Sequence, residues 1–278
     1  MAEHFFTALL TGGVASATAK TVVAPIERVR LVLQTQKSNQ NSVSRVVRHI
    51  VYEQGFRSFW RGNLLNLLRI VPTYGLRFSF FDFFRNIASA GLRKGEPTPL
   101  GRQMLSGAMS GAATVIVTYP LDLARTRVSA DIHSPQRQSI AHFFRKTIKQ
   151  HGPIGLYRGI SVSVVEIAPY VAISLGGYEY GKQYISNGAG SKLVLAWATG
   201  LSGSLFCYPM DTLKRKLMLD SSGSIESSVG FALSLYRQYG IRRFYSGCGI
   251  NAFKSAPAAA LTFVLNDFLK DLVSARRR

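Results

Sequence analysis

The stretch Pro25-Ile-Glu27-Arg-Val-Arg30 decides the fold, because it occurs three times in the chain. The other copies are Pro120-Leu-Asp122-Leu-Ala-Arg125 and Pro209-Met-Asp211-Thr-Leu-Lys214. Their shared pattern is a proline, an acid two residues later and a base three residues after the acid. Because the copies are nearly evenly spaced over 278 residues, they predict three equivalent units in tandem. We expect these units to be residues 1–97, 98–190 and 191–278.

Two further signatures repeat in register with the proline motif. Downstream of each copy, a glycine precedes a tripeptide that begins with an aromatic residue: Trp60-Arg61-Gly62, Tyr157-Arg158-Gly159 and Tyr245-Ser246-Gly247. Each unit closes on an aromatic–acid–x–x–base motif: Phe81-Asp82-x-x-Arg85, Tyr178-Glu179-x-x-Lys182 and a looser Asn266-Asp267-x-x-Lys270. Three signatures in one register indicate a repeat of structure as well as of sequence.

Each unit contains two long apolar stretches separated by a polar one. The predicted spans are about residues 5–33, 63–85, 104–128, 160–182, 193–217 and 248–270. Each is long enough for the roughly 20 residues that a bilayer requires. Only 17% of the residues are charged, which is low for a soluble domain. The sequence therefore predicts an all-α membrane protein with six transmembrane helices, short inner-side helices and a pseudo-threefold bundle around a central cavity.

The charges predict an orientation and a class of partner. The long connection within each unit carries most of the loop cations, for example Arg45, Arg145 and Arg237, so these connections face the inner compartment. We call this side inner and the opposite side outer. The net charge of +20 favours an anionic partner, which could be nucleic acid, lipid or substrate.

The acids Glu27, Asp122 and Asp211 of the proline motifs have two interpretations. They could form three local pairs with Arg30, Arg125 and Lys214, each contributing a few tenths of a kcal/mol. Alternatively, the acid of one repeat could reach the base of the next, forming a ring that closes the inner mouth. Threefold recurrence beside a proline at the end of a span favours the ring.

A second ring would close the outer mouth. Its members are the charged residues of the third signature: Asp82, Arg85, Glu179, Lys182, Asp267 and Lys270. If only one ring forms at a time, the protein has two states, and a substrate can lower the barrier between them.

Five charged residues lie within the predicted spans, where ionisable groups usually face a cavity. They are Lys20, Arg69, Arg77, Glu166 and Lys254. Arg69, Glu166 and Lys254 have the same offset from the tripeptide glycine, so we expect them at one depth. Four cations and one carboxylate favour an anionic substrate held by charge-assisted hydrogen bonds.

Together the three signatures resemble the mitochondrial carrier family over essentially the whole chain. Residues 24–34 (APIERVRLVLQ) and 53–64 (EQGFRSFWRGNL) are similar to ADP/ATP carriers. The resemblance implies exchange of ADP for ATP across the inner membrane of a mitochondrion or a mitochondrion-related organelle. It also implies a protein that works as a monomer and is a transporter rather than an enzyme.

The resemblance implies roles for individual residues. Lys20, Arg69 and Lys254 would contact phosphates, Tyr170 would stack on the base, and Ile167 would line the adenine pocket. Gln34 stands where family members brace the inner ring. The tripeptides would bind the phosphates of cardiolipin as a structural lipid.

Two features leave a related carrier open. ADP/ATP carriers have an RRRMMM hallmark in the third repeat, where this chain has Lys214-Arg215-Lys216-Leu217-Met218-Leu219. Lys254-Ser-Ala-Pro257 is more similar to ATP-Mg/phosphate and coenzyme A carriers. Glu166 replaces a glycine of the nucleotide carriers, either as a counter-ion to Lys254 or Arg69 or as an acid that changes substrate choice. A coenzyme A, ATP-Mg/phosphate or other nucleotide carrier is the alternative.

Other classes fit less well. A nucleic-acid-binding protein would concentrate its basic residues, which here are dispersed over loops and span ends, so no nucleic acid is expected as a partner. A scaffold without transport has no use for polar spans. Two cysteines, Cys207 and Cys248, provide neither a disulfide framework nor a zinc site, so no metal is expected.

Overall fold

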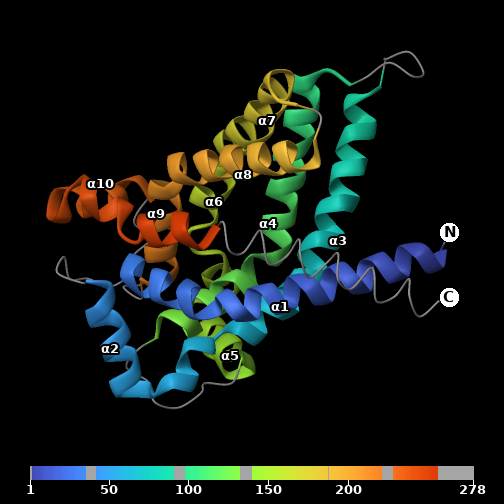
Figure 1. The fold of residues 1–278 in the computed structure, drawn as a ribbon. Helices are drawn as coiled ribbons and strands as arrows, with labels where there is room; N and C mark the ends of the chain where they lie inside the picture. The colour runs from blue at the N-terminus through green and yellow to red at the C-terminus, as the bar shows by residue number, and fades with distance from the viewer. Residues whose placement is uncertain are drawn as a thin grey trace.

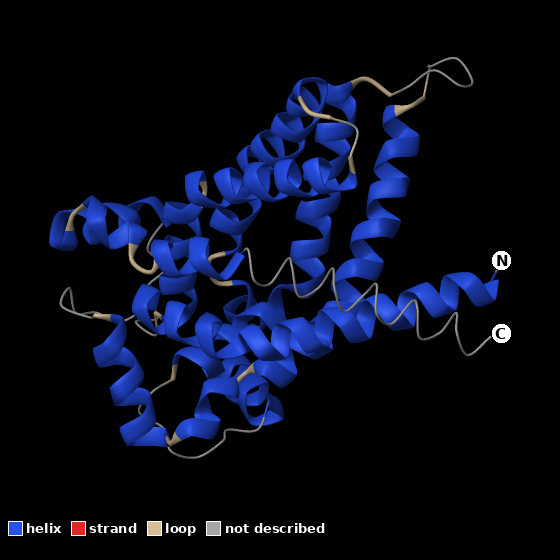
Figure 2. Ribbon diagram, viewed as in Figure 1, coloured by secondary structure: helices blue, strands red, loops and turns tan. Residues whose placement is uncertain are grey.

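The computed structural model describes residues 2–35, 42–90, 98–131, 140–186, 188–220 and 228–255. In these ranges the chain forms helices joined by short turns, without a strand (Figure 2). The first two repeats have the same order of helices: a long helix, a short helix, a 3₁₀ turn and a second long helix. The third follows this order over its described residues, with its first long helix divided into α8 and α9.

The first repeat comprises α1 (Ala2–Thr35), α2 (Val43–Gln54), η1 (Phe56–Trp60) and α3 (Asn63–Ala88). The second begins with α4 (Leu100–Ala130), α5 (Ile140–His151) and η2 (Pro153–Tyr157). Its second long helix runs through α6 (Ile160–Val171), the π turn η3 (Ala172–Gly176), α7 (Gly177–Gly181) and η4 (Lys182–Tyr184). The third comprises α8 (Ala189–Phe206), α9 (Tyr208–Leu219), α10 (Ser228–Tyr239) and η5 (Ile241–Tyr245), followed by helix over residues 248–255.

Glycines explain why the second signature recurs. In the first repeat, η1 lies between Gly55 and Gly62, whose φ angles are 75° and 86°. The corresponding glycines of the other repeats also have positive φ. Residues with a Cβ rarely adopt this conformation, so the chain can turn sharply into and out of each 3₁₀ turn only at glycine. The tripeptides therefore mark the entry into the second span of each repeat.

The membrane-spanning character is clearest in the second and third repeats. Within the described ranges, Leu100–Ala130 and Pro153–Tyr184 are long and apolar enough to cross a membrane. A third span is present if α8 and α9 are counted as one helix bent by 57°. Only 33% and 17% of the most apolar windows of the first two are buried inside the protein, so their apolar faces point outward. The helices α1 and α3 are also long enough to cross a membrane, but α3 is less apolar because it carries Arg69, Arg77 and Asp82.

Proline within a helix commonly produces a kink, but the prolines of the spans differ in their effects. Pro25, Pro72 and Pro120 lie within the single continuous helices α1, α3 and α4. The first span of the third repeat instead breaks at Cys207, immediately before α9 and its Pro209. Pro169 lies near the end of α6, directly before the π turn η3. Proline lacks an N–H group, so the break at Cys207 lies where Pro209 cannot donate a helix hydrogen bond to Leu205. The π turn η3 begins three residues after Pro169.

The helices converge at the inner end of the bundle. Two hydrophobic clusters lie there, one around Val32 and Ile50 of α1 and α2, the other around Tyr119 and Leu123 of α4. Figure 1 shows α2, α5 and α10 at this end, while the N-terminal half of α1 diverges from α3 and α4. The bundle is therefore narrow at its inner end and splayed at its outer end.

Candidate substrate pathway and gates

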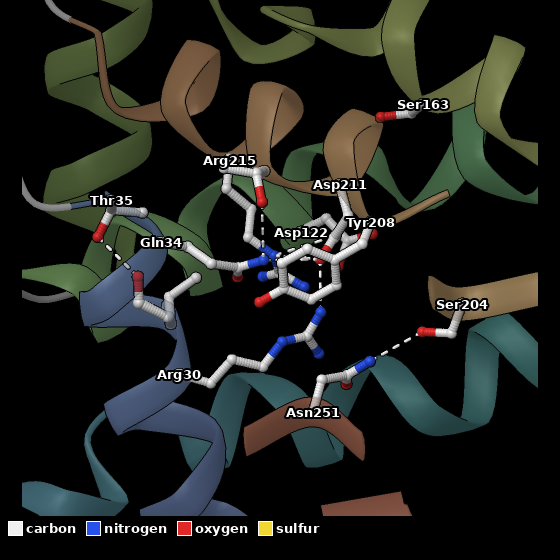
Figure 3. Close-up of polar contacts among 12 residues, drawn as sticks. Arg30, Gln34, Thr35, Asp122, Ser163, Ser204, Tyr208, Asp211, Arg215 and Asn251 are labelled. Carbon is white, nitrogen blue, oxygen red and sulfur yellow. Dashed lines mark hydrogen bonds and ion pairs between the residues drawn. The ribbon is translucent and has the colours of Figure 1, made fainter. Parts of the chain in front are cut away.

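Two inter-repeat pairs of the predicted inner ring are present. Arg125 of α4 bonds to Glu27 of α1, and Arg30 of α1 lies 2.6 Å from Asp211 of α9. The amide nitrogen of Gln34 donates to Asp211 at 3.1 Å, so Gln34 occupies the position expected of a brace (Figure 3). These contacts join the first repeat to both of its neighbours.

The third junction of the ring is different. The ring interpretation places Asp122 against Lys214, but the structure places Asp122 2.6 Å from Arg69 of α3. Among the described residues, Lys214 has no ion pair within 4 Å. The inner ring therefore has no ion pair at the junction of the second and third repeats.

The central cations reach the gate carboxylates directly. Lys254 lies 2.9 Å from Glu27, which it shares with Arg125, and Arg69 bonds to Asp122. Arg69 and Lys254 have the same offset in their repeats, and each binds the gate acid of the following repeat. This shared geometry links the centre of the bundle to its inner gate.

Glu166 breaks this pattern, because it is an acid at the third equivalent position. The gate acid of the following repeat is Asp211, and Glu166 interacts electrostatically with both Asp211 and Lys214. Asp211 is held by Arg215 of its own helix, 3.0 Å away, in addition to Arg30. The expected ion pairs of Glu166 with Arg69 or Lys254 do not form among the described residues, because both cations bind gate acids.

The remaining predicted substrate residues lie on different helices. Lys20 of α1 lies over the ring of Tyr74, 5.6 Å from its centroid. Arg77 of α3 is exposed. Ile167 contacts α4 at Gly111, while Tyr170 lies against α8 at Gly203. Lys20, Arg69 and Lys254 thus come from three spans, whereas Ile167 and Tyr170, both on α6, pack against α4 and α8 respectively.

The predicted outer ring makes no inter-repeat ion pair among the described residues. Asp82 and Arg85 are exposed on α3, and Glu179 pairs with Lys182 of the same helix, 2.9 Å away. Asp267 and Lys270 lie outside the described residues. The molecule is therefore closed at the inner ring and not at the described part of the outer ring.

The hallmark-equivalent residues divide into two groups. Arg215 binds Asp211, but Lys216, Leu217 and Met218 are buried within the inner end of the bundle. The ammonium of Lys216 lies 5.5 Å from the ring centroid of Tyr239, on α10. Leu219 ends α9. The departure from RRRMMM thus falls largely on inner packing rather than on the central cavity.

Sequence reasoning missed a layer of contacts on the inner side of the ring. Arg158 lies 2.6 Å from Asp220, and Arg61 lies 3.8 Å from Asp131. Both bases belong to the tripeptides, and both acids have the same offset from a motif proline in the following repeat. That common offset could have revealed the pairs. Arg28 was also missed: its buried guanidinium donates to the carbonyl oxygens of Ser58, Ser129 and Asp131.

Comparison with known proteins fits this threefold architecture. The family model described as "Mitochondrial carrier protein" matches residues 2–91, 96–189 and 186–277. The chain belongs to the mitochondrial carrier family. It is therefore an all-α membrane protein with six transmembrane helices in three two-helix repeats. The described residues include most of five of these helices and the start of the sixth.

Several relatives are similar over nearly the whole chain. ADP/ATP translocase 4 of Bos taurus is 36% identical over 98% of this chain and 91% of its own length. ADP,ATP carrier protein 1 of Saccharomyces cerevisiae is 34% identical over 93% of this chain and 91% of its own length. The ADP,ATP carrier protein of Parachlorella kessleri is 34% identical over 96% of this chain and 84% of its own length. These relatives are transporters.

Proposed function

We propose that this carrier exchanges ADP for ATP across the inner membrane of a mitochondrion or a mitochondrion-related organelle. Relatives named as ADP/ATP carriers support the substrate, and cations on three spans support an anion. Lys20, Arg69 and Lys254 would hold the phosphates, since Arg and Lys form strong charge-assisted hydrogen bonds with them. Arg77, exposed on α3, would meet the substrate on its way in from the outer side.

One observation carries the mechanism: Arg69 and Lys254 hold the gate acids Asp122 and Glu27. A phosphate that draws these two cations away leaves both carboxylates with fewer partners. Substrate binding then lowers the barrier to opening the inner gate, because the substrate interacts more strongly with the intermediate than with the closed state. Without substrate the cations return to the acids, so the gate opens chiefly when cargo is bound. This competition favours exchange over leak.

We further propose that the chain acts as a monomer, with one central cavity in each three-repeat bundle. Cardiolipin would bind at the tripeptides, where helix N-termini present N–H groups to phosphate oxygens.

The proposal is tested by exchange in proteoliposomes loaded with ADP. The external panel is labelled ADP, ATP, coenzyme A, phosphate and carboxylates, with and without Mg²⁺. We expect the fastest exchange with ADP or ATP; an absence of all nucleotide exchange would overturn the proposal. In the same assay, Arg69→Ala should abolish exchange while the protein remains folded. Arg102→Ala, on the outer end of α4, is the matched control and should retain exchange.

Glu166 favours the alternative, a coenzyme A, ATP-Mg/phosphate or other nucleotide carrier. A carboxylate beside the gate acid Asp211 reduces the positive charge of the pathway and could meet a substrate-bound cation. Fastest exchange with coenzyme A, or with ATP only when Mg²⁺ is present, would favour this alternative. In the second case Glu166→Gln should remove the dependence on Mg²⁺.

A further inference from the structure

A polar cavity of about 100 Å³ lies beside the inner gate, between α1, η1, α3 and α4. Its lining follows α1 from Ala24 through Glu27 to Gln34, so it extends inward beyond the gate carboxylate. A cavity needs only about 10–15 Å³ to hold one water molecule. The volume therefore accommodates a group such as a phosphate.

The cavity exists because the first repeat differs from the other two. Tyr119 and Tyr208 precede the motif prolines of the second and third repeats, and both are fully buried. Their hydroxyls donate to the carbonyl oxygens of Arg158 and Ser246, at 2.7 and 2.8 Å. Each hydroxyl lies 3.1 Å from where a Cβ would stand on the tripeptide glycine. Two repeats thus fill this position with a tyrosine ring.

In the first repeat, Ala24 occupies the equivalent position and lines the cavity. The carbonyl oxygen of Arg61 accepts instead from the hydroxyl of Ser129, which reaches across from α4 at 3.1 Å. The backbone is satisfied without a tyrosine, and the volume of the ring is left open. The absence of a tyrosine in the first repeat therefore opens a space without leaving the carbonyl group of Arg61 unsatisfied.

The walls of this cavity are strongly cationic. Among the described residues that line it, Glu27 is the one carboxylate, against six cations: Arg28, Arg30, Arg61, Arg125, Arg215 and Lys254. Several of these bind carboxylates, but Arg28, only 2% exposed, directs its hydrogen bonds to carbonyl oxygens and to the amide oxygen of Gln54. The carboxylate of Asp131 also interacts with Arg28, but the cations of the lining outnumber the carboxylates around them, which leaves a positive potential in the cavity.

Polar groups in the lining also lack partners. Asn66 is 3% exposed, and its side chain makes no hydrogen bond among the described residues. Arg30 has a buried Nε without an acceptor in the same part of the chain. Asn66 lies in the first turns of α3, whose N-terminus favours negative charge. The buried Nε donor of Arg30 is complementary to an anion, and the unpartnered side-chain oxygens of Gln34 and Asn63 can accept from the hydroxyl of a protonated phosphate.

We propose that this cavity is a second phosphate-binding site, on the inner side of the gate, which holds a phosphate group of the nucleotide as the pair Glu27–Arg125 opens. The nature of the cargo rests on the proposed function, whereas binding of a phosphate group does not. Because the cavity extends inward from the gate, it serves substrate that enters from the inner compartment. The two faces of the carrier should therefore differ in affinity.

The decisive variant is Ala24→Tyr, which fills the cavity with the side chain that the other repeats carry. We expect the half-saturation concentration for ADP at the inner face to rise about tenfold, as for loss of one hydrogen bond to a charged group. The outer-face value should stay within about twofold of the wild type. Vesicles of right-side-out and inside-out orientation separate the two faces. Val22→Tyr adds the same group on the exposed face of α1 and should change neither value.

A second measurement requires no nucleotide. Inorganic phosphate, compared with chloride at equal ionic strength, should raise the thermal unfolding midpoint of the wild type and of Val22→Tyr but not of Ala24→Tyr. Asn66→Leu should lose the phosphate effect as well, and it decides the matter if Ala24→Tyr does not fold.

The outcomes separate this proposal from the proposed function. If the phosphate effect is absent from the wild type, or persists in both cavity variants, the cavity is not a phosphate site, even where ADP exchange is normal. If an anionic phospholipid stabilises the wild type through this cavity and inorganic phosphate does not, the occupant is a lipid headgroup and the transport role is overturned. A cavity-dependent phosphate effect without nucleotide exchange would overturn only the proposed substrate.

Discussion

The two ends of the bundle carry similar acid and base motifs but arrange them differently. At the inner end, Glu27 and Asp211 bind bases of other repeats. At the outer end, Glu179 binds Lys182 three residues further along the same helix, and Asp82 is exposed. The spans converge at the first end and diverge at the second. Pairing therefore depends on the state of the bundle, and the same motif is a gate or a local helix contact according to its neighbours.

The difference in burial predicts a difference in energy. The side chain of Asp211 is 14% exposed, whereas that of Lys182 is 42% exposed. Exposed pairs contribute little because water and salt screen them. Removing one member of a buried pair costs much more, since the other charge remains without a partner. In this state, stability should therefore depend on the inner end.

The largest effect is expected from Asp211→Asn. This change leaves Arg30 and Arg215 buried without their shared carboxylate, and should lower the free energy of unfolding by about 3–5 kcal/mol. Thermal or denaturant unfolding of the purified carrier measures it. Glu179→Gln, which removes a carboxylate from the exposed outer pair, should leave the midpoint nearly unchanged. Equal losses in the two variants would contradict the contrast between the ends.

A smaller effect is expected from Gln34→Ala. Gln34 is fully buried and donates to the charged Asp211, so its loss should lower the free energy of unfolding by about 2 kcal/mol. The matched control at the outer end is Gln103→Ala, whose side-chain amide donates to the carbonyl oxygen of Thr98 and to no other group of the described residues. We expect that control to cost about 1 kcal/mol or less. If Gln103→Ala costs as much as Gln34→Ala, the brace has no special role.

The smallest effect on stability is expected from Asp82→Asn, which should change the free energy of unfolding by less than about 0.5 kcal/mol. The exchange rate should nevertheless fall several-fold, because the proposed outer ring would lose one of its carboxylates. Stability and transport are measured on the same preparation. An unchanged exchange rate would remove Asp82 from the outer gate.

The sequence predicted the features that depend on repetition. Three copies of each signature were sufficient to locate the long helices of the first five predicted spans, whereas most of the sixth lies outside the described residues. They also favoured contacts between an acid of one repeat and a base of the next, as Glu27 and Arg125 now illustrate. Offsets along a helix are fixed by geometry, so equivalent residues in the three repeats lie at equivalent depths.

Features that depend on competition between side chains could not be predicted. Asp122 has more than one candidate cation, and the long side chain of Arg69 reaches it from the centre of the bundle. The space beside Ala24 arises because no tyrosine stands at this position, and a missing side chain does not appear as a motif. Arg28 stands within the proline motif, but its role depends on carbonyl groups of η1 and α4, which come together only in the folded chain.

The gate ring joins the first repeat to both neighbours by ion pairs, but its described residues provide none between the second and third repeats. If the three junctions between repeats were equal, all three repeats would move together when the inner mouth opens. If one junction of the ring is weaker, the mouth opens by separation of the two repeats on either side of it. Between the second and third repeats the ion pair lies further inward, where Arg158 is 2.6 Å from Asp220, so we expect this junction to part at the ring first while the inner pair still holds. The order of movement would then be determined by which junction of the ring lacks an ion pair, before any substrate binds.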